Sequence, residues 1–287
     1  MVIFKQLLLF FILLFSNILL SHTSEIVTIY ASEFDKTITQ YEYLLVNFYS
    51  EDCPHSQSLK PIYNQLSEIV SKNLKNVTLA QVYVVGQHAL INKYDIRGTP
   101  TVILFKNGEI QGTFYSEKTL REIFTWLFKK IDGKVKTLNK GSDIDQAWDR
   151  FSISLVLFGN KEKCPSLFQT FENSASQFDD IIFSYCESSS CFDSYQAKQC
   201  EIFLLKHFEE KKIVFNVSKE STSLNDWIQL NKQPLIHNFE EYSSALIFSH
   251  QNPAVILFRD RELSGDKNPL YELSMIEVAK KFKVTNN

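Results

Sequence analysis

The sequence predicts an α/β protein in which strands and helices alternate through two consecutive modules and part of a third. Short apolar segments typical of buried strands alternate with segments whose apolar residues recur at helical spacing, and the same strand and helix order occurs twice. The composition, with 44% hydrophobic residues but only 8 Gly and 7 Pro, favours compact folded domains over linkers. We expect an N-terminal segment at 1–24 and modules at 25–131, 132–232 and 233–287.

Residues 1–24 have the pattern of a cleavable secretory signal peptide. One basic residue, Lys5, precedes the apolar run at 7–20, and small polar residues such as Ser21 and Thr23 follow it. The run is short and weakly flanked for a membrane span, which leaves a retained anchor as the alternative. We therefore expect entry into the secretory pathway, cleavage of the segment, and no membrane attachment afterwards.

The expected compartment is oxidising, so the five cysteines are candidates for disulfides or for a reactive thiol. No paired Cys-x-x-Cys knuckles occur, so we expect neither a zinc site nor another metal or cofactor. The formal net charge of −3 and the lack of a basic stripe argue against nucleic acid as a partner. Asn76 and Asn216 begin Asn-x-Thr and Asn-x-Ser tripeptides and are candidate glycosylation sites.

The first module begins with a strand, at 44–49, that leads into a cysteine at the start of a helix. A short acidic turn separates this strand from Cys53, and Pro54 then suits the first helical position. The N-terminus of a helix offers unpaired N–H groups and partial positive charge, which lower the pKa of a thiol and favour the nucleophilic thiolate. The alternative is a small buried hydrophobe without chemistry.

A second segment, YDIRGTPTVILFKNG at 94–108, predicts a turn, a buried strand and a hairpin. The Gly-Thr-Pro turn contains Thr99 and Pro100 and opens the strand, and Asn107-Gly108 is a hairpin signal toward the strand at 110–114. An amphipathic helix at 118–130 closes the module.

Residues 25–131 resemble a thioredoxin domain of the protein disulfide isomerase family. VNFYSEDCPHSQSLKP stands where relatives have a strand, a Trp-Cys-x-x-Cys site and Lys-Pro, and RGTPTVILFKNG matches the segment with the cis-proline. The resemblance implies a central mixed sheet flanked by helices, with Cys53 as the nucleophile. It also implies that Thr99 and Pro100 contact the backbone of a bound client, as in strand addition.

Two departures from the family pattern remove the parts of a full redox cycle. Ser56 stands where relatives carry the second, resolving cysteine, as in single-cysteine Cys-x-x-Ser members of the family. Asn47 stands where relatives keep a buried acid that takes a proton from that second cysteine. The two losses are consistent with each other.

Two further features of the sequence next to Cys53 have opposite expected effects on the pKa of its thiol. Asp52 replaces the usual tryptophan, and an anion beside the thiolate raises the pKa. The pair Pro54-His55 also lies between the cysteines of a strongly oxidising bacterial oxidase, whose thiol is strongly acidified. The sequence does not rank these effects.

Residues 132–232 repeat the strand and helix order of the first module and resemble the redox-inactive middle domains of disulfide isomerases. The expected elements are helices at 143–151, 166–178, around 195 and at 224–230, strands at 153–158, 180–185 and 201–206, and a hairpin at 208–217.

Overlaying the two modules implies a structural disulfide between Cys164 and Cys200. The overlay puts Cys200 where Pro100 stands and Cys164 near Cys53, and in this fold the cis-proline loop packs against the active-site cysteine. The alternative is that Cys164 is a second redox nucleophile, which is disfavoured because the Cys-Pro-Ser-Leu sequence lacks a nearby resolving thiol.

Cys186 and Cys191 would then pair with each other or stay reduced. Four cysteines allow three connectivities, among which the sequence does not choose.

From residue 233 a third round of elements is expected, with helices at 242–249 and 270–282 and a strand at 254–259. It resembles the first half of the substrate-binding middle domain of the family, so we expect a partial, truncated module or a half-domain that packs on something else. No Lys-Asp-Glu-Leu tail follows, so secretion is the alternative to residence in the endoplasmic reticulum.

The resemblance implies a folding factor of the endoplasmic reticulum lumen that exchanges disulfides with client proteins through Cys53 alone, with glutathione as a possible second thiol. The alternative is a non-catalytic chaperone that binds unfolded clients on a thioredoxin fold, because a fold does not fix a function. A monothiol glutaredoxin-like iron–sulfur carrier is disfavoured by the signal sequence.

Overall fold

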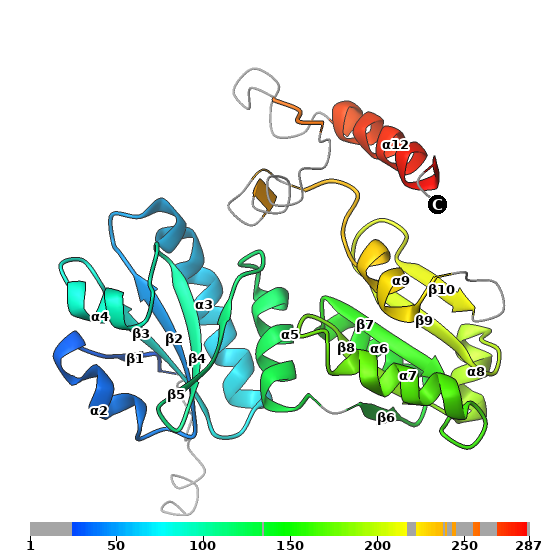
Figure 1. The fold of residues 1–287 in the computed structure, drawn as a ribbon, viewed down its shortest axis with the longest axis horizontal. Helices are drawn as coiled ribbons and strands as arrows, with labels where there is room; N and C mark the ends of the chain where they lie inside the picture. The colour runs from blue at the N-terminus through cyan, green and yellow to red at the C-terminus, as the bar shows by residue number, and fades with distance from the viewer. Residues whose placement is uncertain are drawn as a thin grey trace, which may run out of the picture. The chain divides into compact units, whose positions relative to one another are not determined.

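A computed structural model describes residues 25–133, 135–216, 222–237, 239, 243–244, 255–258 and 269–285 of the chain. The chain divides into two compact units, one of Met1–Phe114 with Lys118–Phe128 and the other of Tyr115–Glu117 with Lys129–Asn287. Each unit contains its own five-stranded sheet (Figure 1).

The sheet of the first unit is mixed. Its strand order is β1-β3-β2-β4-β5, in which β1, β3 and β2 run parallel to one another and β4 and β5 pair antiparallel. The strands are β1 (Val27–Thr28), β2 (Tyr43–Tyr49), β3 (Val77–Tyr83), β4 (Thr101–Lys106) and β5 (Glu109–Phe114). The helices of this unit are η1 (Ala31–Glu33), α2 (Phe34–Ile38), α3 (Pro54–Asn73), α4 (His88–Lys93) and α5 (Leu120–Ile131), the last of which continues into the second unit.

The central strand β2 anchors the core of the first unit. Leu44, Val46 and Phe48 alternate along β2 and lie in one cluster of buried residues with Phe34 and Phe105. On α3, the fully buried Tyr63 hydroxyl lies 2.7 Å from the Leu45 carbonyl oxygen of β2 and 3.1 Å from that of Ala80 on β3. Tyr63 therefore fixes α3 against the two central strands.

The hairpin between β4 and β5 forms as the sequence predicts. Asn107 and Gly108 have φ angles of 50° and 87°, and two successive positive φ angles define the tight turn that Asn-Gly favours. The strand register shifts between Leu104 and Phe105, which marks a β-bulge.

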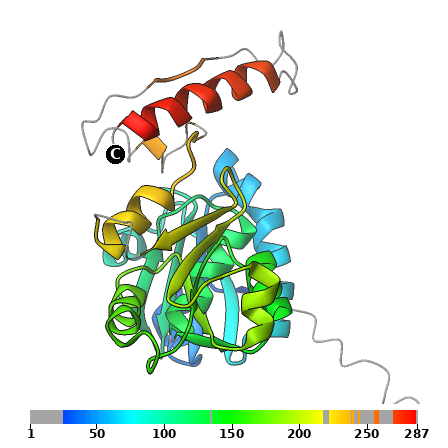
Figure 2. The same cartoon turned by 90° about the vertical axis from the view of Figure 1, so that its right-hand side faces the viewer.

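The second unit repeats the topology of the first. Its strand order is β10-β9-β7-β8-β6, with β6, β8 and β7 parallel and β9 and β10 antiparallel, so each strand has a counterpart in the first sheet. This repetition confirms the predicted tandem α/β fold. The strands are β6 (Lys136–Leu138), β7 (Ile153–Phe158), β8 (Ile182–Cys186), β9 (Glu201–Lys206) and β10 (Lys212–Asn216), and Figure 2 shows the β9–β10 hairpin toward the viewer.

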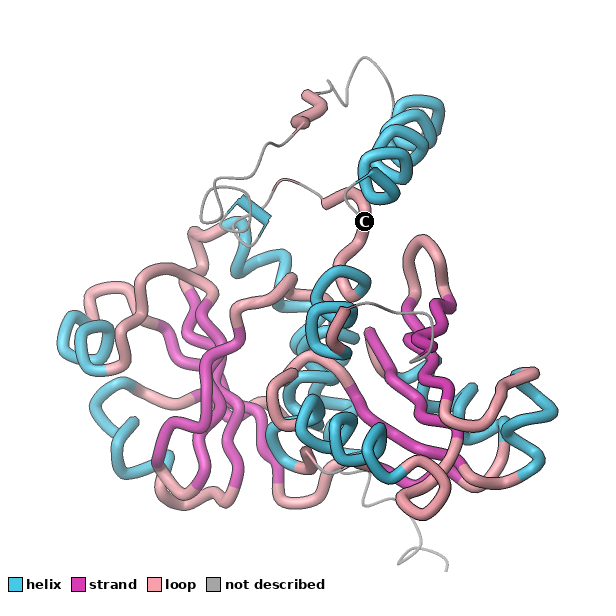
Figure 3. The backbone as a smooth tube through the Cα atoms, turned by 45° about the vertical axis from the view of Figure 1, so that its right-hand side comes forward, coloured by secondary structure: helices cyan, strands magenta, loops and turns pink. Residues whose placement is uncertain are grey.

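Apolar side chains cover both faces of the second sheet. Along β7, Leu155 and Leu157 belong to one cluster of buried residues, and Val156 and Phe158 belong to another. Both faces are buried because helices flank the sheet (Figure 3). These helices are α6 (Gly141–Arg150), α7 (Pro165–Ala175), α8 (Ser189–Tyr195) and α9 (Leu224–Asn231).

The C-terminal part agrees only partly with the expectation. The predicted helix at 270–282 is present as α12 (Pro269–Thr285). Residues 255–258 form no strand, so the expected strand at 254–259 is wrong over these four residues, which pair with no strand in the part of the chain that the structure describes. Residues 243–244 are helical, as the predicted helix at 242–249 requires, whereas the other residues of that helix and the signal segment 1–24 lie outside the described residues and stay predictions.

Within the ranges given above, none of the helices has the length and apolar character needed to cross a membrane.

Replacing Tyr63 with phenylalanine should lower the free energy of unfolding by about 1–2 kcal/mol, because buried strand carbonyls lose a hydrogen-bond donor. Urea denaturation followed by circular dichroism measures this loss. Tyr30→Phe is the control, since Tyr30 is 72% exposed and should change stability little. Equal stability of the two variants would contradict the anchoring role of Tyr63.

Candidate functional site

Cys53 lies where strand β2 passes into helix α3. It is the N-cap residue of α3, with extended backbone angles, and Pro54 occupies the first turn. The first hydrogen bond of the helix runs from the Gln57 N–H to the Cys53 carbonyl oxygen. Cys53 is partly exposed and is the one cysteine of the five outside a disulfide. The position expected for a reactive thiol is therefore occupied by a free one.

The loop before β4 faces the thiol. The peptide bond between Thr99 and Pro100 is cis, and β4 begins at the next residue. Antiparallel pairing aligns Phe48 of β2 with Thr101 of β4, so the residues that flank this pair come together. As a result, the Cys53 thiol donates to the Thr99 carbonyl oxygen at 3.0 Å.

The surroundings of Cys53 lower the pKa of its thiol. The largest cause is a hydrogen bond with the Thr99 side chain, and the N–H groups of Ser56 and His55 and the Ser56 hydroxyl act in the same direction. Partial burial opposes them. Asp52 is exposed, so water screens its charge. The opposing effects that the sequence left unranked therefore sum to a lowered pKa of the Cys53 thiol.

Ser56 and Asn47, which replace the resolving cysteine and the buried acid of the family pattern, are both buried. Ser56 is 4% exposed, and its hydroxyl oxygen accepts a hydrogen bond from the Ser50 N–H at 3.3 Å. Asn47 is also 4% exposed, and its side-chain oxygen has no hydrogen-bond partner among the described residues. Neither side chain forms a disulfide or takes up a proton as a carboxylate would. The first unit thus holds one sulfur at this site.

The two candidate glycosylation sites lie at strand boundaries. Asn76 is exposed just before β3 with a φ angle of 64°, and its amide donates to the Glu42 carboxylate at 2.8 Å. Asn216 is the last residue of β10. Modification of either asparagine stays a prediction.

The four remaining cysteines form two disulfides in the second unit. Cys164 is bonded to Cys200 with a Cα–Cα distance of 5.7 Å, the pairing that the overlay of the modules implied. Cys186 at the end of β8 is bonded to Cys191 in α8, with a Cα–Cα distance of 6.4 Å. The sequence left this second pairing open, because it did not define the turn that brings the two residues together.

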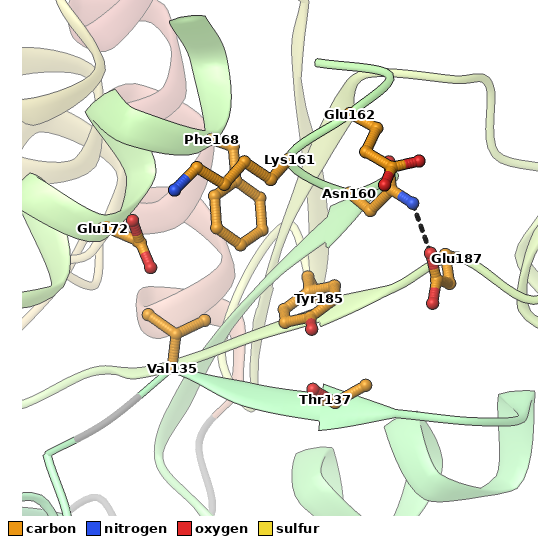
Figure 4. Close-up of a pocket in the computed structure, with 9 residues that line it drawn as sticks. All are labelled: Val135, Thr137, Asn160, Lys161, Glu162, Phe168, Glu172, Tyr185 and Glu187. Atoms are coloured by element: carbon orange, nitrogen blue, oxygen red, sulfur yellow. Dashed lines mark hydrogen bonds between the residues drawn. The ribbon is translucent and has the colours of Figure 1, made fainter. Parts of the chain in front are cut away.

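The second unit also has a pocket of about 500 Å³ that the sequence analysis did not identify (Figure 4). Its charged lining is mainly acidic, and the Phe168 and Tyr185 rings form an edge contact with centroids 5.1 Å apart. The charged residues are Lys161, Glu162, Glu172 and Glu187. They come from three separate segments of the chain, so no local motif announces the pocket. No cysteine lines it.

Among the described residues, no group of His, Cys, Asp and Glu side chains is arranged to hold a metal ion.

Comparison with solved structures finds similar chains, with low TM-scores. Form I of human ERp44 shares 20% identity with a TM-score of 0.38, and the match covers 90% of this chain and 68% of that one. The first two thioredoxin domains of Naumovozyma dairenensis Eps1p share 15% identity with a TM-score of 0.41, covering 74% of this chain and 97% of that one.

Sequence comparison finds curated relatives along most of the chain. Protein disulfide-isomerase from Drosophila melanogaster is 27% identical over 251 residues, covering 87% of this chain and 50% of the relative. Protein disulfide-isomerase from Oryctolagus cuniculus is also 27% identical, covering 83% of this chain and 48% of the relative. Protein disulfide isomerase-like 1-3 from Arabidopsis thaliana is 28% identical, covering 87% and 43%. The chain thus spans about half the length of these relatives.

Two domain families match the chain directly. Residues 25–129 match the thioredoxin family, and residues 158–287 match a thioredoxin-like domain family. The first match lies almost wholly in the first unit, the second covers the second unit from the last residue of β7 onward, and the curated relatives match 83–87% of the chain. Two thioredoxin-type family models therefore match most of the chain between them, and the chain is similar along most of its length to protein disulfide isomerases.

Proposed function

We propose that this protein is a folding factor of the endoplasmic reticulum lumen that exchanges disulfides with client proteins through Cys53. The observation that carries the proposal is a free, partly exposed thiol at a helix N-cap with a lowered pKa. The thiolate is the form that attacks disulfides, and the helix N-terminus stabilises it. The similarity to protein disulfide isomerases and the secretory pattern of residues 1–24 support the compartment and the class of client.

The proposed reaction is a pair of exchanges. The Cys53 thiolate attacks one sulfur of a client disulfide, a new bond forms between Cys53 and that sulfur, and the other client sulfur leaves as a thiolate. A second client thiolate, or glutathione, then attacks the mixed disulfide and releases Cys53. The number of disulfides is unchanged when a client thiolate does this, so the reaction is an isomerisation.

Ser56 makes the mixed disulfide long-lived. A second cysteine at this position would displace the client from within the site, whereas a buried hydroxyl does not react with a disulfide. Release therefore depends on a thiol that arrives from outside. Retention of clients through their free or mismatched cysteines follows from the same chemistry.

Thr99 and Pro100 are the proposed contact for the client backbone. They lie on the loop before β4, with the Thr99 carbonyl oxygen 3.0 Å from the Cys53 sulfur. A client strand that pairs beside this loop would bring its own sulfur within reach of Cys53.

A non-catalytic chaperone is the second candidate, and the burial of Ser56 and Asn47 in place of a resolving pair favours it. In that case the units bind unfolded chains and Cys53 takes no part. The experiment that follows separates the two functions.

Mixed disulfides with a scrambled client should be trapped by the wild-type protein and be absent with Cys53→Ser. Acid quenching, alkylation and non-reducing electrophoresis measure the adducts. Non-covalent binding, measured by light scattering of an aggregating client, is the control. If the wild-type protein and Cys53→Ser prevent client aggregation equally and neither forms adducts, exchange through Cys53 is excluded. The chaperone function then remains.

Thr99→Val should raise the pKa of Cys53, because the variant removes the side-chain hydrogen bond that contributes most to lowering it. At a pH below the raised pKa, the variant has a smaller fraction of Cys53 as thiolate than the wild-type protein. Alkylation of Cys53 near neutral pH should therefore be slower in the variant. The measurement is the pH profile of iodoacetamide labelling at Cys53, read by peptide mass. Thr113→Val, on β5, is the matched control and should keep the wild-type profile. A profile unchanged in Thr99→Val would contradict the assigned cause.

Ser56→Cys should shorten the lifetime of the trapped adducts at least about tenfold, because an intramolecular thiol acts at a high effective concentration. Pulse-chase quantification of the adducts after thiol removal measures this lifetime. Ser56→Ala is the control, which alters the same buried position without adding sulfur. The contrary outcome is that the client leaves the Ser56→Cys variant as slowly as the wild-type protein, with no disulfide between Cys53 and the introduced thiol. That result would mean that α3 does not bring the two positions together.

A further inference from the structure

We propose that the Cys164–Cys200 disulfide is a second exchange site, which takes two electrons from a client dithiol. This activity is separate from that of Cys53 and does not depend on it.

The backbone around this disulfide repeats the backbone around Cys53. Cys164 is the N-cap residue of α7, Pro165 occupies the first turn, and the Phe168 N–H donates to the Cys164 carbonyl oxygen at 2.8 Å. Cys200 directly precedes β9, which pairs antiparallel with β7. Cys200 therefore occupies the place of the cis-proline, and the second unit has two sulfurs where the first has one.

The Cys164 sulfur is placed to leave as a thiolate. Cys164 is 4% exposed, lies at the N-terminus of α7, and accepts a hydrogen bond from the Gln199 side-chain amide at 3.2 Å. Both the open N–H groups of a helix N-terminus and an amide donor stabilise a negative sulfur. The residue that was expected to lack a resolving partner has one in Cys200.

Cys200 is the more exposed residue of the bridge, so its sulfur is the proposed point of attack for an entering thiolate. Cys200 is partly exposed, and its sulfur lies 3.6 Å from the Lys163 carbonyl oxygen at the surface. The bridge is thus asymmetric, with an accessible sulfur for attack and a buried, stabilised sulfur as the leaving group. A low pKa of the leaving thiol speeds this exchange.

The backbone beside the bridge is shaped around the contact between Gln199 and Cys164. A Cβ atom added to Gly159 would lie 2.5 Å from the Gln199 amide nitrogen and 2.7 Å from the Cys164 sulfur. Gly159 also has a φ angle of 143°. Only glycine leaves the room in which the amide reaches the sulfur.

The other disulfide shows what a closed bridge looks like in the same unit. Cys186 and Cys191 are each 0% exposed and lie in an apolar cluster. No thiolate reaches either sulfur without local unfolding. The pair is an internal reference for the reactivity of Cys164–Cys200.

The proposed oxidation of a client dithiol by the Cys164–Cys200 disulfide takes place in two steps. A client thiolate attacks the Cys200 sulfur, the Cys164–Cys200 bond breaks, and Cys164 keeps the electron pair. A second client thiolate attacks the client sulfur of this mixed disulfide, the client disulfide forms, and Cys200 leaves as a thiolate. The client has lost two electrons, the bridge has gained them, and the client's two protons pass to solvent or to the new thiols. Oxidised glutathione reverses the change.

The test uses the full chain with Cys53→Ser, so that a failure of Cys53 chemistry does not affect the result. The native protein is incubated with reduced glutathione, quenched with acid and alkylated, and each cysteine pair is quantified by peptide mass. We expect Cys164–Cys200 to open at least about tenfold faster than Cys186–Cys191. Equal rates, or opening only on unfolding, would overturn the proposal and leave a structural bridge.

Two charge-matched variants test the leaving group. Gln199→Glu replaces the amide donor with a negative charge beside the Cys164 sulfur and should slow opening roughly tenfold. Gln196→Glu adds the same charge to an exposed residue that lies three positions earlier and should keep the parent rate. Equal rates in both variants would contradict the assignment of Cys164 as the leaving sulfur.

The direction of attack is tested by removing one sulfur at a time in the same background. Cys164→Ser leaves the accessible Cys200, which should form an adduct with oxidised glutathione. Cys200→Ser leaves the buried Cys164, which should form much less. The opposite ranking, with both variants folded by circular dichroism, would overturn the proposed order of the exchange.

Discussion

The antiparallel pairing of β2 with β4 is the constraint on which the site depends. It aligns Phe48 with Thr101, so the turn that leaves β2 and the loop that enters β4 lie at the same end of the sheet. Cys53 and Thr99 are 46 residues apart in the chain, yet this register puts the sulfur 3.0 Å from a carbonyl oxygen. The same register brings the Thr99 side chain to Cys53, and a hydrogen bond of that side chain, not the carbonyl contact, is the main cause of the lowered pKa of the thiol.

The second unit uses the same frame with different side chains. Pairing of β7 with β9 aligns Phe158 with Glu201, and the residues beyond this pair are brought together as in the first unit. There, the two residues are Cys164 and Cys200, so the contact becomes a covalent bond. One backbone topology therefore presents a lone thiol in one unit and a bridged pair in the other. The difference lies at one position, where the second unit has Cys200 in place of Pro100, and not in the fold.

Much of the fold could be predicted because its strongest elements carry local patterns. The Asn107-Gly108 turn and the largely apolar strands β2 and β7 are examples, since Asn-Gly favours positive φ angles and buried strands are rich in apolar residues. The edge strands β1 and β6 were not predicted, because two and three residues are too few to show an alternating pattern. The expected strand over 255–258 was wrong, because an apolar run becomes a strand only where it has a neighbour to bond.

The sequence by itself determined the order of most of the longer elements, the cysteine at a helix start, and the departures at Ser56 and Asn47, because each is a property of neighbouring residues in the chain. Tertiary structure decided the rest. Three features depend on contacts between separate segments of the chain. They are the Cys186–Cys191 disulfide, the downward shift in the pKa of Cys53 and the acidic pocket of the second unit. The groups around Cys53 shift the pKa of its thiol in opposite directions, and the net shift depends on their distances from the sulfur. Those distances are set by the register of the paired strands.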